Sequence, residues 1–199
     1  MLTACDAALQ VRELLNDVGE LNYNKLNWGD DEARRLAIVL PMCVSLRVLH
    51  LTGNGRIGDE GMAALAHAWG AGAAPKLAEP RLGGNSIGDD GLRALCDAVG
   101  GNGALPVLEQ LHLNINLIGD SGLRSLAHAA ADSNAAFAQL RTLNLQHNPR
   151  ISEEGVDALS SMLAAGGLVS LRQVSLPPQL CAIPQLTTAC GARGILLQP

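Results

Sequence analysis

Apolar residues recur along the chain in a fixed frame, which is clearest between residues 108 and 126. There the order is Leu108-x-x-Leu111-x-Leu113-x-x-Asn116-x-Ile118-x-x-x-Gly122-x-x-x-Leu126. The asparagine of this frame returns at intervals of 31, 31 and 32 residues, as Asn54, Asn85, Asn116 and Asn148. Such a recurrence predicts a stack of similar units, so that function lies on a repeated surface and not in one pocket.

Each unit contains a strand followed by a helix. The Leu-x-Leu pair has the period of two that is typical of a short strand with its leucines pointing inward. After the asparagine a helical period begins, as in Leu92, Leu95 and Val99. Alternating strands and helices predict a parallel sheet. Because a helix is about 10 Å wide and strands lie about 4.8 Å apart, an α/β solenoid should curve, with strands on the concave face and α-helices on the convex face.

The frame also predicts the domain organisation. We expect an N-terminal capping helix over residues 1–17 and repeats over residues 18–176, with one degenerate unit, four full units and a terminal unit without the asparagine. Residues 177–199 should form a C-terminal cap, with a short helix over 186–192 and a strand over 194–197, because a solenoid otherwise ends on bare leucines.

Several repeated polar and glycine positions have structural explanations. The four asparagines should be structural, because a buried amide supplies both a donor and an acceptor to turns that have left the ladder. Acidic residues precede each helix, and we expect them to cap its N–H groups. The glycines that follow should allow close approach of neighbouring helices; they are Gly61, Gly91, Gly122 and Gly155. Pro80 replaces a core leucine and predicts a local irregularity in the sheet.

Composition narrows the possible partners. The net charge is −5, lysine is limited to Lys25 and Lys76, and there are only four aromatic residues, so binding to nucleic acid is disfavoured. No apolar run is long enough for a membrane span, and the start does not resemble a signal peptide. Five cysteines without a C-x-x-C pair favour a reduced, intracellular protein. We therefore expect a monomer without membrane association in the cytoplasm or nucleus.

Two features imitate chemical sites. Residues 53–58 match G-x-G-x-x-G, a dinucleotide-binding pattern, but the repeat frame already explains each of these residues. His50 and His112 share an outward strand column, yet Arg81 lies between them, so we expect solvent-facing histidines rather than a zinc site. We predict no catalytic residue, no cofactor and no metal, and hence no enzyme.

The frame, together with Ile-Gly-Asp-x-Gly at residues 57–61, 87–91 and 118–122, resembles leucine-rich repeats of the ribonuclease-inhibitor-like subtype. The resemblance implies a right-handed leucine-rich-repeat solenoid with a horseshoe arc. Similar proteins include ribonuclease inhibitor, the repeat regions of NOD-like receptors, Ran GTPase-activating proteins and tropomodulins. We predict a non-enzymatic protein-binding scaffold, because the chain shows no catalytic constellation beside a rigid, variable and polar concave surface. Two alternatives are a regulator of a small GTPase and an inert fragment of a larger NOD-like sensor.

The expected binding surface is the concave strand face. Its outward positions supply the candidate partner contacts, which are Arg47, His50, Thr52, Glu79, Arg81, Glu109, Gln110, His112, Asn114, Arg141, Asn144, Gln146, Arg172 and Ser175. Glu109 and Arg141 are neighbours of opposite charge in one column. The sequence leaves open whether they form a solvated ion pair or belong to the pattern that a partner recognises.

Overall fold

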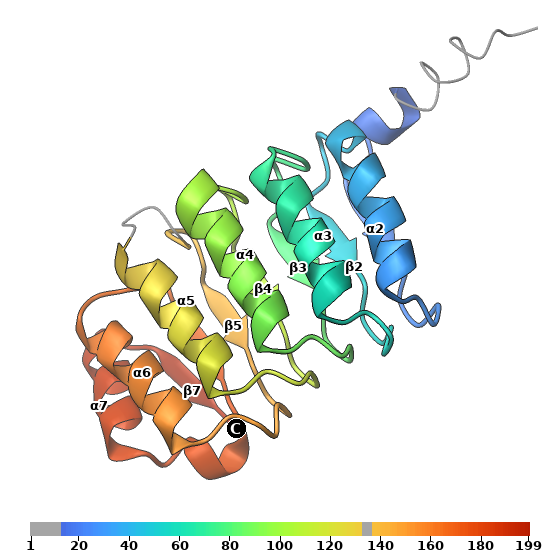
Figure 1. Cartoon of the computed structure of the whole chain (residues 1–199). Coiled ribbons are helices and arrows are strands. Elements are labelled where there is room, and N and C mark those ends of the chain that lie inside the picture. The colour runs from blue at the N-terminus through green and yellow to red at the C-terminus, as the bar shows by residue number, and fades with distance from the viewer. Residues whose placement is uncertain (1–12, 133–136) are drawn as a thin grey trace, which may run out of the picture.

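Seven short strands alternate with helices in the computed structural model, which describes residues 13–132 and 137–199. Figure 1 shows the helices in a row on one side of the molecule and the strands on the other. The strands are β1 (Glu20–Asn22), β2 (Val48–His50), β3 (Glu79–Arg81), β4 (Gln110–His112), β5 (Thr142–Asn144), β6 (Gln173–Ser175) and β7 (Leu196–Gln198). The α-helices are α2 (Asp30–Val39), α3 (Asp59–Gly70), α4 (Asp89–Asn102), α5 (Asp120–Asp132), α6 (Glu153–Ala164) and α7 (Pro184–Arg193).

The strands form one parallel sheet in chain order, from β1 to β7. One continuous core fills the space between sheet and helices. The middle residue of each inner strand points into it, as Leu49, Leu111 and Leu143 do, all with no exposed surface. The predicted α/β solenoid, with strands on the concave face and helices on the convex face, is confirmed.

The four asparagines are buried and tie each repeat to the one before it. Asn116 is representative. Its amide nitrogen donates to the carbonyls of Leu113 in its own unit and Leu82 in the preceding unit, at 3.1 and 3.0 Å. Its oxygen accepts the N–H of Ile87 at 3.0 Å. Asn54, Asn85 and Asn148 make equivalent bonds. In the geometry of the structure the asparagines thus satisfy backbone groups at the turn, as the frame suggested.

The asparagine contacts form a ladder that links each repeat to the preceding one. A second ladder, made by aspartates, links each repeat to the following one. The Asp30 carboxylate at the start of α2 accepts the N–H groups of Gly58 and Gly61 at 2.7 and 2.9 Å, which lie at the start of α3. Asp59, Asp89 and Asp120 repeat this contact with the following helix. The expectation that each acid caps its own helix is therefore wrong for these four residues. Helices packed side by side bring each Oδ1 within hydrogen-bond distance of the neighbour's free amides.

The glycines at the fourth helical position follow from this ladder. A Cβ atom added at Gly61 would lie 2.6 Å from Oδ1 of Asp30, and one added at Gly91 would lie 2.7 Å from Oδ1 of Asp59. The predicted close approach is therefore confirmed, and its cause is a carboxylate from the neighbouring repeat.

Pro80 interrupts the sheet between β3 and β4. These strands pair only at Arg81 and His112, whereas β2 and β3 pair over three residues. Proline has no N–H to donate to the next strand, so the expected irregularity is present and is confined to one ladder step.

The two ends of the stack differ. Residues 1–12 of the expected N-terminal helix lie outside the described residues. Residues 13–16 are helical, with Leu15 packed on the core and Leu14 73% exposed. At the other end a short 3-10 helix, η2 (Pro178–Leu180), leads into α7 and β7. Arg193 of α7 donates to the carbonyls of Leu163, Gly167 and Leu168, which fixes α7 to the end of α6.

Candidate protein-binding face

The concave face is made by the first and third residues of each strand. Because successive side chains alternate, burying Leu111 forces Gln110 and His112 of β4 to the outer side. The same parity places Glu79 and Arg81 on β3, and Thr142 and Asn144 on β5. The register aligns these positions across strands, with His112 opposite both Arg81 and Asn144. The structure therefore gathers the third-position residues into one row.

His50 does not face solvent. Its side chain is 8% exposed, and Nε2 lies 2.7 Å from Oε1 of Glu20 on the neighbouring strand β1. Nε2 has no partner with hydrogen-bond geometry within the described chain. The prediction of a solvent-facing histidine is wrong here because Glu20, which was not among the candidates, occupies the space beside the ring.

Glu79 organises a small charged cluster at the centre of the face. Its carboxylate lies 2.6 Å from Nε of Arg81 and 3.5 Å from Nε2 of His112, and its side chain is only 14% exposed. Gln110 lies 3.4 Å from the same ring nitrogen. Burial lowers the pKa of His112 below its ordinary 6.5; Glu79 opposes this shift and Arg81 adds to it. His112 is therefore a neutral, half-buried side chain near pH 7 and not a solvent-facing one.

The remaining polar candidates are mostly half-buried and engaged locally. Thr52 lies 3.5 Å from the carbonyl of Arg81, and Oδ1 of Asn144 accepts the N–H of Gln146 at 3.1 Å. Gln146 donates to the carbonyl of Pro199. Asn114 is half-buried, while Ser175 is 2% exposed and offers almost no surface. His50 and Ser175 are therefore the two least accessible of the candidate residues.

Three arginines remain exposed at the start of β2, β5 and β6. Arg47, Arg141 and Arg172 occupy one column, and no ion pair joins any of them to another described side chain. The ion pair considered for Glu109 and Arg141 is therefore not formed. Their connection is through the backbone, where the N–H of Arg141 donates to the carbonyl of Glu109 at 2.7 Å.

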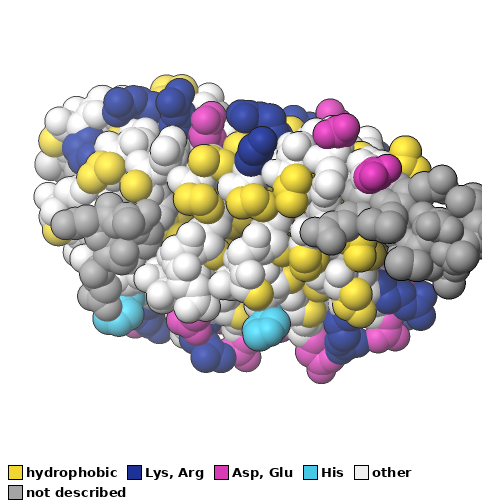
Figure 2. Space-filling view, turned by 90° about the horizontal axis from the view of Figure 1, so that it is seen from above, with side chains coloured by type: hydrophobic (Ala, Val, Ile, Leu, Met, Phe, Trp, Pro, Cys, Tyr) yellow, Lys and Arg dark blue, Asp and Glu magenta, His cyan; other side chains and the backbone are white. Residues whose placement is uncertain are grey.

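A row of exposed apolar side chains lies next to this column, and the sequence analysis missed it. The loops that return from helix to strand expose Val44, Pro75, Pro106 and Val169, each two residues before the first leucine of its unit. Figure 2 looks onto this side of the molecule, where hydrophobic side chains cross the middle and Lys and Arg lie along both borders together with Asp and Glu. Aligning the columns outside the leucine frame would have revealed the row.

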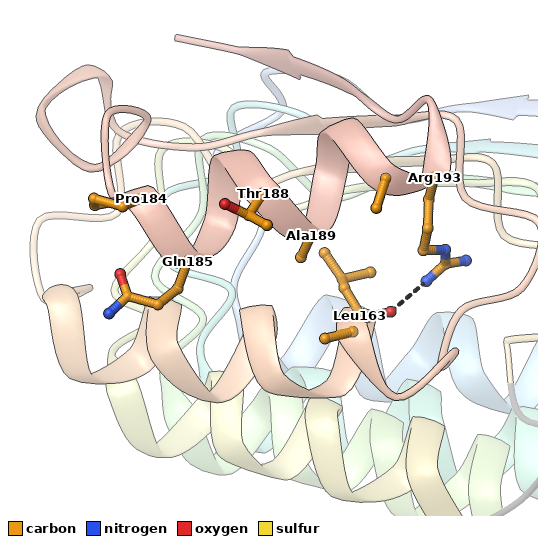
Figure 3. Close-up of a pocket in the computed structure, with 8 residues that line it drawn as sticks. Leu163, Pro184, Gln185, Thr188, Ala189 and Arg193 are labelled. Carbon is orange, nitrogen blue, oxygen red and sulfur yellow. Dashed lines mark hydrogen bonds between the residues drawn. The ribbon is translucent and has the colours of Figure 1, made fainter.

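The open grooves lie elsewhere. One of about 450 Å³ separates α6 from α7, and Figure 3 shows Leu163, Pro184, Thr188 and Ala189 along it with Arg193 at one end. Among the residues that the structure describes, no three His, Cys, Asp or Glu side chains converge as a metal site would require. At the glycine-rich turn before α3, the N–H groups of Gly58 and Gly61 already donate to Asp30.

Comparison with known proteins places the chain among leucine-rich repeats. A family model described as "Leucine Rich repeat" matches residues 43–66, 81–96, 104–127 and 139–160. A search of curated proteins found no match. Among solved structures, actin-binding site 2 of leiomodin-1 is similar, with a TM-score of 0.57 and 15% identity over 84% of this chain and 89% of that one. An internalin from Listeria monocytogenes gives a TM-score of 0.49 and 19% identity, over 83% and 36% of the two chains.

The repeated frame, the parallel sheet and the matched family model together define the class of protein. The chain belongs to the leucine-rich repeat proteins. Within residues 13–132 and 137–199, no helix has the length and apolar character needed to cross a membrane.

Proposed function

We propose that this chain is a non-enzymatic module that binds a protein partner on its concave strand face. The observation that carries the proposal is that polar residues with a structural role and polar residues on the outward strand positions are separate sets. The asparagine and aspartate ladders satisfy the turns and helix ends, whereas the outward strand positions serve neither ladder. Polar side chains on a rigid sheet suit recognition of another protein, since a preorganised surface loses little entropy on binding.

The proposed contact surface keeps all the predicted residues except His50 and Ser175, which are buried. Its centre is the cluster of Glu79, Arg81 and His112, flanked by Gln110 and Asn144. A partly desolvated group of this kind is a better candidate for a binding hot spot than an isolated surface charge.

Two narrower assignments belong to the same proposal. The α-helices on the convex side and the repeats of about 30 residues favour the ribonuclease-inhibitor-like subtype. Among the residues that the structure describes, Cys43, Cys96, Cys181 and Cys190 are free cysteines, which favours a reducing, intracellular location.

The test is capture of partners from the source cell, identified by mass spectrometry, with a pair of matched variants. Gln110→Arg with Asn144→Arg adds two long cations to the concave face. Ala63→Arg with Ser161→Arg adds the same groups to exposed positions of α3 and α6. The proposal expects the concave variant to lose a protein that the wild-type and convex variants retain. Loss from the convex variant alone, or a wild-type chain that captures nothing, contradicts it.

A further inference from the structure

Three of the four residues in the exposed apolar row, Pro75, Pro106 and Val169, follow a repeated kink in the return loops. Ala74, Leu105 and Leu168 have positive φ values of 46°, 51° and 50°, although none is glycine, and their side chains are buried. The next residue in each loop, Pro75, Pro106 or Val169, is then turned outward and is exposed. A left-handed conformation is unfavourable for such residues, so burial of the kinked side chain holds it in place. The apolar residue that follows the kink is exposed, so its side chain does not contribute to the core.

The basic column runs parallel to this row along the start of the strands. Backbone bonds join Arg47 to Ala78, Ala78 to Glu109, Glu109 to Arg141, and Arg141 to Arg172, at 2.7–2.9 Å. Arg141 and Arg172 are therefore side by side, about one strand spacing of 4.8 Å apart at the backbone. Arg34, Arg81, Arg93 and Arg124 all have carboxylate partners, whereas Arg47, Arg141 and Arg172 have none among the described side chains.

Neither row favours the folded state by itself. Like charges on adjacent strands repel weakly in water, and apolar side chains left in solvent forgo the free energy of burial. Both rows become favourable when a ligand supplies carboxylates to the arginines and apolar groups to the loops. We use the name return-loop edge for Val44, Pro75, Pro106 and Val169 with Arg47, Arg141 and Arg172. Figure 2 shows the apolar band on this side of the molecule.

We propose that the return-loop edge binds an extended, acidic segment of a partner protein, with carboxylates on the arginines and apolar side chains on the exposed prolines and valines. The proposal rests on the protein-binding function above and adds the chemistry of the partner. From Arg47 to Arg172 there are four strand spacings, about 19 Å. An extended peptide of about six residues covers that length. The peptide should carry two carboxylates at the end that lies over the adjacent Arg141 and Arg172. It should carry one carboxylate at the end that lies over Arg47.

A protein segment suits this edge better than a nucleic acid. Glu109 stands in the middle of the basic column and would repel a uniform chain of phosphates. The apolar row supplies valine and proline but no aromatic ring on which a base could stack. A peptide can place a neutral residue opposite Glu109 and aliphatic side chains over the loops.

The test uses a fluorescein-labelled peptide of about ten residues, with two Glu at one end, one Glu at the other and Leu or Val between them. A second peptide has Gln in place of each Glu. Fluorescence anisotropy measures binding to the full chain, to Arg141→Glu with Arg172→Glu, and to Val169→Ser. The matched control is Arg56→Glu with Arg150→Glu, which makes the same charge change at exposed arginines in the loops after the strands.

We expect the acidic peptide to bind the wild type at least about tenfold more tightly than the Gln peptide does. The affinity of the acidic peptide should fall as the salt concentration rises. The arginine double variant should lose at least about tenfold in affinity and Val169→Ser severalfold, while the control changes by less than about twofold. Thermal melts of each variant establish that the fold is retained, since the changed side chains are exposed.

Equal binding of the two peptides, or equal loss in the control, overturns the proposal. So does a single-stranded oligonucleotide or an anionic vesicle that binds through Arg141 and Arg172 when the acidic peptide does not. The two proposals fail separately. If the wild-type chain does not bind the acidic peptide but the concave variant still loses its captured protein, only the edge proposal fails. If the peptide binds the edge but the concave variants capture normally, only the concave assignment fails.

Discussion

The carboxylate of Asp59 occupies the space that a side chain at residue 91 would need. Its Oδ1 lies 2.9 Å from the N–H nitrogen of Gly91, and a Cβ atom at residue 91 would come within 2.7 Å of it. One contact thus explains both a repeated acid and a repeated glycine, which belong to different repeats and stand 32 residues apart.

Gly91→Ala should therefore destabilise the chain by about 2–4 kcal/mol, because Asp59 must move and lose charge-assisted hydrogen bonds to Gly88 and Gly91. Urea denaturation measures the effect. Gly101→Ala in the same helix is the matched control, since an added Cβ there meets nothing within 4 Å. Alanine's higher helix propensity should make that variant equal to or up to about 1 kcal/mol more stable than the wild type. Equal losses at the two sites would contradict the carboxylate explanation.

Asn116→Ala should cost about 3 kcal/mol, because it leaves the buried carbonyls of Leu82 and Leu113 and the N–H of Ile87 without their partner. Chemical denaturation of Asn116→Ala beside Asn102→Ala tests this. Asn102 is exposed at the end of α4, and its replacement should change stability by less than about 0.5 kcal/mol. A mild effect at Asn116 would mean that water replaces the amide.

Acid should weaken the aspartate ladder at Asp120. Burial acts to raise the pKa of Asp120, but hydrogen bonds from Ser152 and Gly155 hold it below its ordinary 3.8. A carboxyl group with a lowered folded pKa contributes stability above the unfolded value, and this contribution is lost as the pH falls through the folded value. Asp120→Asn should thus be less stable than the wild type at pH 7, with the difference shrinking below about pH 4. Denaturation of both chains between these values measures it; a difference that is constant with pH speaks against the ionic contribution.

His112 should lose a proton more readily than an ordinary histidine. Its folded pKa lies below 6.5, so its stabilising contribution is full above pH 6.5 and is lost as the pH falls through that value toward the folded pKa. An NMR titration of the ring measures this directly. Arg81→Gln should raise the pKa, because it removes a positive charge, and Glu79→Gln should lower it further. Shifts of the same sign in both variants would show that burial alone controls the group.

The periodicity of the sequence determined most of the fold. Leu49, Leu111 and Leu143 repeat at the spacing of one strand per unit, and only a parallel stack buries all of them at once. Local chemistry also marked Asn54, Asn85, Asn116 and Asn148 as structural, because a buried amide at a turn has few other uses.

Only the tertiary structure decided which residue meets which across neighbouring repeats. The acids were predicted to cap their own helices, yet Asp30 serves α3, since side-by-side packing brings the next helix within reach. His50 was expected in solvent, yet Glu20 lies against it from another strand. Arg141 has the opposite charge to Glu109 but forms no pair with it. Sequence spacing fixes the column in which a side chain stands; lateral packing between repeats fixes its partner and its exposure, and with them the surface left for binding.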